Sequence, residues 1–145
     1  MNAPMIAIPR YTKMFWLSYG ICMVWAFLAV IAIYKFAPLN ENFQNLNVIE
    51  SALSAKMSFR RMVLIVVGAI AINALLFSQS RHLDKFLIFL ASWMWAAYID
   101  DYLVMSRYVY LPDEIYAQIL ILMRPFVVFL VSWMAVESHL RWLLK

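Results

Sequence analysis

Four long runs of apolar residues constrain this chain more than any other feature of its sequence. A helix that crosses about 30 Å of hydrocarbon needs about 20 residues, and a helix satisfies all of its backbone polar groups within one segment. Each run is long enough for such a crossing. The runs predict membrane-spanning helices over residues 14–36, 62–80, 86–110 and 115–136.

The composition agrees with a membrane protein. Hydrophobic residues make up 66% of the 145 residues and charged residues 14%, whereas soluble domains have about 45–50% and about 25%. A single cysteine, Cys22, excludes a disulfide-built fold. The segments between the runs are too short to fold around cores of their own. We therefore predict an all-α integral membrane protein, one domain whose four transmembrane helices form an antiparallel bundle.

A further helix is predicted in the connection between the first and second crossings. Apolar residues recur there at helical spacing, with polar residues elsewhere around the wheel. This pattern predicts an amphipathic helix over about residues 46–59. It can lie in the membrane interface or pack on the bundle, and the sequence favours neither arrangement.

Four crossings place both termini on one side of the membrane. Basic residues are nearly balanced, with six flanking the helices on the side of the termini and five on the opposite side. The positive-inside rule thus favours cytoplasmic termini by a single residue. The net charge of +4 fits contact with anionic headgroups, so the expected partners include membrane lipids and exclude nucleic acid.

Polar residues inside the predicted crossings form the one candidate site. Asp100 and Arg124 each lie twelve residues from Pro112, so the two arms of a helical hairpin would bring them to the same depth. Asn73 enters from the same side to a similar or slightly greater depth. We expect a buried polar layer of Asn73, Asp100, Asp101 and Arg124, with an ion pair between Asp100 and Arg124.

Two carboxylates face one guanidinium in this layer, so one carboxylate needs another donor, a proton, a cation or a partner protein. Pro125 lacks an N–H and frees the carbonyl of Ile121, which predicts a helix kink and an acceptor near Arg124. Such a layer can hold helices together or conduct protons or ions. We favour the structural role, because the chain has only two glycines and few candidate helix breaks.

His82 and His139 are the only histidines, and both fall on the side of the termini. They are weak candidates for axial ligands of a b-type haem, and their position near the surface favours ordinary interfacial histidines. The sequence has no paired nucleophile and base, no clustered metal-ligand set and no phosphate-binding glycine loop. We expect bound lipids but no haem, pigment, metal or catalytic activity.

These features favour a non-catalytic accessory, structural or assembly subunit of a larger membrane complex. It would dock on other integral membrane subunits through its apolar helix faces and the polar layer. The alternative is a small proton- or cation-coupled transporter or channel, in which Asp100 or Asp101 binds the ion and Arg124 is the counter-charge.

Overall fold

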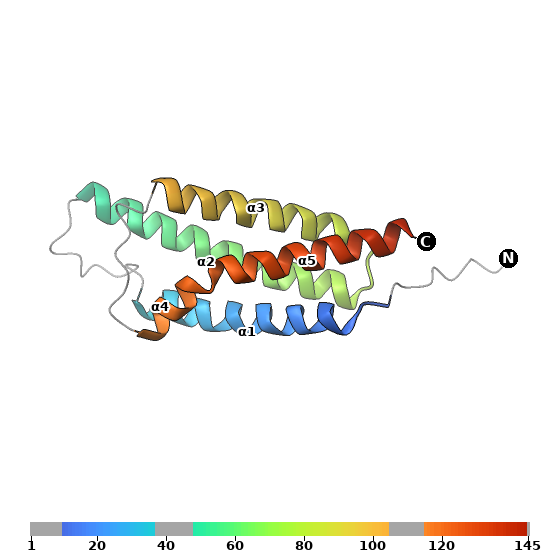
Figure 1. Ribbon diagram of the computed structural model, residues 1–145. Coiled ribbons are helices and arrows are strands. Elements are labelled where there is room, and N and C mark those ends of the chain that lie inside the picture. The colour runs from blue at the N-terminus through green and yellow to red at the C-terminus, as the bar shows by residue number, and fades with distance from the viewer. Residues whose placement is uncertain (1–9, 37–47, 105–114, 145) are drawn as a thin grey trace.

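Every element that the structure describes is an α-helix. The computed structural model describes residues 10–36, 48–104 and 115–144. The helices are α1 (Lys13–Phe36), α2 (Val48–Phe77), α3 (Leu83–Val104), α4 (Ile115–Leu122) and α5 (Arg124–Leu143), shown in Figure 1. The all-helical prediction is therefore confirmed.

Three of these helices are long and apolar enough to cross a membrane. They are Lys13–Lys35, Phe59–Phe77 and Arg124–Leu143. This finding is consistent with a membrane protein, as the sequence predicts. The first crossing, predicted over residues 14–36, corresponds closely to α1.

The four longest helices lie along a common direction, with α4 near one end of the bundle (Figure 1). The start of α1, the end of α5 and the turn between α2 and α3 lie together at one end, which we call the terminal end. Helix α5 packs against α3 and α1, whereas α2 packs against α1 and α3. Helix α5 contributes Val127, Leu130, Val131, Met134 and Ala135 to the buried core, and the described part of α2 contributes only Ile72 and Leu76, so α2 is peripheral.

Helix α1 buries one narrow stripe. The buried side chains recur at alternating spacings of three and four residues and are Phe15, Ser18, Cys22, Trp25, Ala29 and Ala32. This spacing keeps one face toward the neighbouring helices. Most members of the stripe are small, which lets the backbones of neighbouring helices approach closely.

The predicted amphipathic helix and the second crossing form one continuous helix. Helix α2 runs for 30 residues through the predicted boundary near residue 60. Arg60 and Arg61 occupy that boundary, and arginine is a good helix former, so nothing there interrupts the helix. The prediction of two separate elements is thus corrected to a single helix of about 45 Å.

Helix α2 ends at Phe77, three residues before the predicted end. Gln79 has a positive φ of 53°, and its N–H donates to the Leu76 carbonyl at 3.2 Å. The Ser80 N–H donates to the Leu75 carbonyl at 3.0 Å. This pair of bonds is a Schellman motif, with glutamine in the left-handed position that glycine usually takes.

The third predicted crossing begins earlier than expected, since α3 starts at Leu83. Its predicted continuation over residues 105–110 lies outside the described residues. The fourth is divided by a break at Met123 into α4 and α5, and α5 continues to Leu143, seven residues past the predicted end. Pro125, the second residue of α5, explains the break, because proline is compatible with the first turn of a helix but not with its interior.

Candidate functional site

The residues of the expected polar layer lie at two levels of the bundle. Asp100 forms an ion pair with Arg60 of α2, with 3.5 Å between the Arg60 Nη2 and Asp100 Oδ2 atoms. Both side chains are about half exposed, at 47% for Arg60 and 48% for Asp100. The structure thus gives Asp100 an exposed position and a partner other than the expected Arg124.

Asn73 occupies a different level. Thirteen residues of continuous helix separate it from Arg60, which corresponds to about 20 Å. The Tyr19 hydroxyl of α1 donates to the Asn73 Oδ1 atom. The Asn73 Nδ2 donates to the Ala69 carbonyl at 2.7 Å and contacts the Met23 Sδ atom at 3.3 Å. Asn73 therefore joins α1 to α2 and does not share a layer with Asp100.

Arg124 lies directly at the break between α4 and α5. Its Nε donates to the Ile121 carbonyl at 3.2 Å, the group that Pro125 leaves without its usual helical partner. The Trp25 indole of α1 donates to the neighbouring Leu120 carbonyl at 3.0 Å. Side chains thus satisfy the carbonyls at the break. Asp101 lies on α3, but its side chain is outside the described residues.

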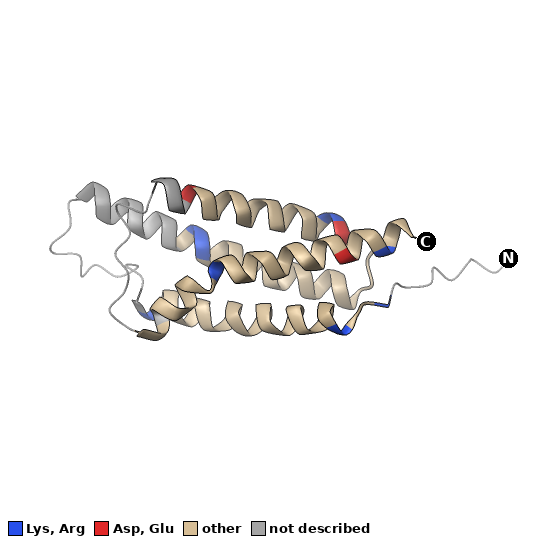
Figure 2. Ribbon diagram, in the orientation of Figure 1, with Lys and Arg blue, Asp and Glu red and all other residues tan. Residues whose placement is uncertain are grey.

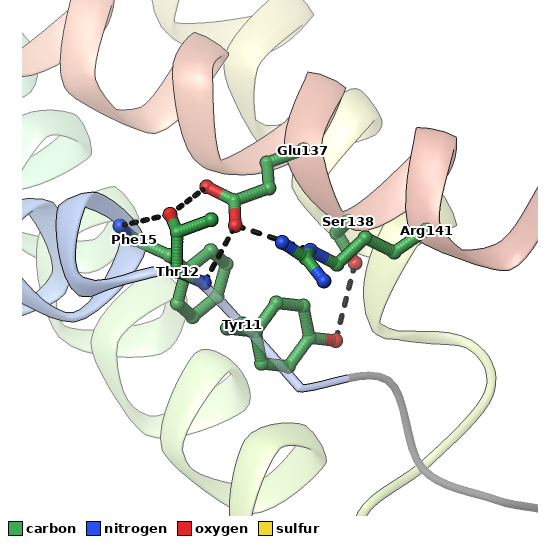
Figure 3. Close-up of polar contacts among 6 residues, drawn as sticks. All are labelled: Tyr11, Thr12, Phe15, Glu137, Ser138 and Arg141. Carbon is green, nitrogen blue, oxygen red and sulfur yellow. Dashed lines mark hydrogen bonds and ion pairs between the residues drawn. The ribbon is translucent and has the colours of Figure 1, made fainter.

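The densest polar cluster joins the start of α1 to the end of α5, and Figure 3 shows it. Glu137 accepts from the Thr12 backbone N–H at 2.8 Å and from the Thr12 hydroxyl at 2.9 Å. Arg141, one turn along α5, donates to the same carboxylate at 3.3 Å. We call Thr12, Glu137 and Arg141 the clasp.

Thr12 also caps α1. Its Oγ1 atom accepts a hydrogen bond from the Phe15 N–H at 3.3 Å, and its hydroxyl donates a hydrogen bond to Glu137 (Figure 3). Threonine at this position satisfies one of the free N–H groups of the first turn. The Glu137 carboxylate satisfies the N–H of Thr12 itself and places negative charge near the positive end of the α1 dipole.

Tyr11 extends the contact between α1 and α5. Its hydroxyl lies 3.4 Å from the buried Ser138 hydroxyl (Figure 3). The Tyr11 ring stacks on Phe15 with centroids 4.0 Å apart. Trp16 meets the rings of Phe15 and Tyr19 edge to face. An aromatic cluster of Tyr11, Phe15, Trp16 and Tyr19 therefore surrounds the start of α1.

A buried carboxylate lies at the same end. The Asp84 side chain of α3 is 9% exposed, and its Oδ2 atom lies 3.3 Å from Nδ1 of His139 on α5. Its Oδ1 atom is buried without a hydrogen-bond partner. His82 is exposed in the turn before α3, and its backbone N–H donates to the Ser80 hydroxyl at 3.2 Å. The two weak haem-ligand candidates thus have separate surroundings.

The described charged residues gather toward the two ends of the bundle, and the helices between them carry few (Figure 2). Within the described part of the chain, no group of three His, Cys, Asp or Glu side chains could hold a metal ion. Many of the described polar contacts link one helix to another or satisfy backbone groups at helix ends, and the hydroxyls of Ser92 and Ser132 donate to carbonyls one turn back in their own helices.

Sequence reasoning did not identify the clasp or the Asp84–His139 contact as sites. Both join residues more than 50 positions apart, and no local pattern carries that pairing. One signal was available, because threonine directly before an apolar helix is typical of an N-cap. Comparison with protein-family models, curated proteins and solved structures finds no match to this chain.

Proposed function

We propose that this chain is a non-catalytic accessory subunit of a larger membrane complex and crosses the membrane four times as an antiparallel bundle. The 22 residues of α3 span about 33 Å, enough for a fourth crossing, and α3 packs along α5. Nearly all of the described residues belong to the helices, so the proposal places the function in the bundle and on its faces.

The outward faces of the helices carry this proposal. In α2, 17% of the spanning segment is buried within the chain, compared with 22% in α1 and 39% in α5. Its outward side chains are large and apolar and include Val63, Val67, Ile70 and Phe77. Among these three segments, α2 is the one that its own chain covers least. We propose that its outward face packs on the helices of another integral membrane subunit.

Purification from the native membrane tests the proposal. The chain carries a C-terminal affinity tag and is extracted in a gentle detergent, and the size and protein content of the purified particle are measured. Two variants map the contact: Val67→Trp on α2 and Val24→Trp on α1, both replacing exposed valines. We expect stoichiometric membrane subunits with the wild type and with Val24→Trp, and their loss with Val67→Trp.

A lone chain or a homo-oligomer in that purification would contradict the proposal. The second candidate function is then a small proton- or cation-coupled transporter or channel, with Asp100 or Asp101 as the ion site and Arg124 as counter-charge. The observation that favours it is the half-exposed Asp100 carboxylate, whose ion pair with Arg60 is long at 3.5 Å. In liposomes, this function requires flux that Asp100→Asn or Asp101→Asn abolishes while the variant stays folded.

A further inference from the structure

The exposed charged side chains described at the terminal end are all of one sign. Arg10 and Lys13 lie at the start of α1, and Arg81 and Lys85 flank the start of α3. All four side chains are exposed. Among the described residues of this end, every exposed charged side chain is basic. The outer surface of the terminal end therefore carries uncompensated positive charge.

The carboxylates of the same end are turned inward. The Asp84 and Glu137 side chains are each only 9% exposed. Asp84 contacts His139, while Glu137 accepts from Thr12 and Arg141. Neither carboxylate forms an ion pair with Arg10, Lys13, Arg81 or Lys85. The sequence alone, which gives nearly equal numbers of basic residues on the two sides, does not reveal this separation.

The aromatic cluster fixes the depth of the terminal end. Trp16 is 47% exposed and lies three residues, or about 4.5 Å, from Lys13. Tyrosine and tryptophan side chains of membrane proteins concentrate at the level of the lipid headgroups. A Trp16 ring at that level puts the Lys13 ammonium in reach of lipid phosphates.

From this placement we infer that the terminal end binds the phosphate groups of anionic phospholipids through Arg10, Lys13, Arg81 and Lys85. The inference rests on the proposed membrane location and adds a lipid class and a side of contact. Basic side chains beside a membrane surface attract anionic lipids, and each contributes separately. The positive charges surround the end of the bundle, so they recruit a layer of lipids around it.

The opposite end supplies a matched control. Lys35, near the end of α1, is exposed like Lys13 and Lys85. Arg60 at that end is paired with an exposed carboxylate, Asp100. Replacing Lys13, Lys85 or Lys35 by glutamine removes one positive charge in each case. The three variants have the same net charge and differ in where the charge is lost.

The test measures lipid retained by the full chain. The wild type, Lys13→Gln, Lys85→Gln and Lys35→Gln are reconstituted in equimolar phosphatidylglycerol and phosphatidylcholine and then extracted in mild detergent. The ratio of the two lipids that remain bound is measured by mass spectrometry. We expect phosphatidylglycerol to be enriched on the wild type. Lys13→Gln and Lys85→Gln should each lower the enrichment about two- to fivefold, and Lys35→Gln should leave it unchanged.

Three outcomes would overturn the inference. Equal retention of the two lipids by the wild type would show no preference for anionic headgroups. An equal loss in Lys35→Gln would assign the preference to net charge and not to the terminal end. A chain that retains neither lipid would overturn the membrane location as well, which separates that failure from the first two.

Discussion

At the scale of single residues, several of the described polar side chains form hydrogen bonds that join one helix to another. Glu137 is the clearest case, since it accepts three hydrogen bonds and joins α1 to α5, the first and last of the described helices in the sequence. Tyr19 and Asn73 do the same between α1 and α2. Hydrogen bonds between helices in a membrane contribute about 0.6–2 kcal/mol each.

Replacing Glu137 by glutamine should destabilise the bundle by about 1–3 kcal/mol. The neutral amide replaces the charge-assisted bonds that the carboxylate accepts from the Thr12 N–H and from Arg141, and it reverses the bond to the Thr12 hydroxyl, whose Oγ1 already accepts from the Phe15 N–H. The free energy of unfolding in mixed detergent micelles measures the loss. Arg141→Gln is the control, and it should cost less than about 0.5 kcal/mol because it breaks only a partly exposed i,i+4 pair. Equal losses in the two variants would contradict the role of the clasp.

Tyr19→Phe should destabilise the chain by about 0.6–2 kcal/mol, because it removes the hydroxyl that donates to Asn73 and joins α1 to α2. Tyr34→Phe removes the same hydroxyl from a side chain that is 75% exposed, so its unfolding free energy should match that of the wild type. The comparison uses the same unfolding measurement. A neutral Tyr19→Phe would show that Asn73 does not need this donor.

Single residues show how far sequence reasoning reaches. The contact of Arg124 with the Ile121 carbonyl follows from local covalent chemistry, because Pro125 has no N–H to offer. The partner of Asp100 does not follow from local chemistry. It depends on where α3 lies relative to α2. The prediction of equal depth for Asp100 and Arg124 rested on their equal separation from Pro112, and it assumed that both arms of the hairpin are uninterrupted helices. The break at Met123 invalidates that assumption for one of the two arms.

At the scale of elements, helix ends are decided by interactions that hydrophobic patterns do not include. The apolar run predicts α2 to residue 80, but the Schellman motif ends it at Phe77. The amphipathic pattern over about residues 46–59 predicts a separate helix, yet Arg60 and Arg61 continue the helix and the segment from Val48 is the first part of α2. Helix type and approximate extent are therefore readable from periodicity, and the ends are not.

Gln79→Gly should stabilise the chain by about 0.5–1 kcal/mol. Gln79 has a φ of 53°, a conformation that strains a residue with a Cβ atom and does not strain glycine. The thermal midpoint in detergent measures the change. Ser78→Gly, one position earlier, should give no gain, because it loses a hydroxyl bond to the Leu75 carbonyl at 3.3 Å. Stabilisation by both variants would assign the effect to general flexibility of the turn.

At the scale of the whole molecule, the bundle separates its surfaces by chemistry. Apolar side chains cover the outward helix faces, and charged residues gather toward the ends (Figure 2). The sequence predicts this division, because the apolar runs and the charges alternate along the chain. It does not predict which charged side chains are bonded within the bundle, since that depends on contacts such as Thr12 with Glu137.

The number of crossings is the central claim at this scale. Helices α1, α2 and α5 qualify as crossings by length and composition, and α3 is the helix that decides the total. If α3 also crosses, the start of α1 and the end of α5 lie on the same side of the membrane. If α3 does not cross, a chain of three crossings would have its two ends on opposite sides, and the contact of Thr12 with Glu137 would have to be broken.

The labelling of single cysteines by a membrane-impermeant maleimide tests this claim most directly. Cys22, the one native cysteine, is buried and is replaced by alanine. Cysteines are then introduced one at a time at the exposed positions Arg10, Lys35 and Leu144. The account predicts that Arg10→Cys and Leu144→Cys react from one side of the membrane and Lys35→Cys from the other. Reaction of Arg10→Cys and Leu144→Cys from opposite sides would contradict the four-crossing bundle.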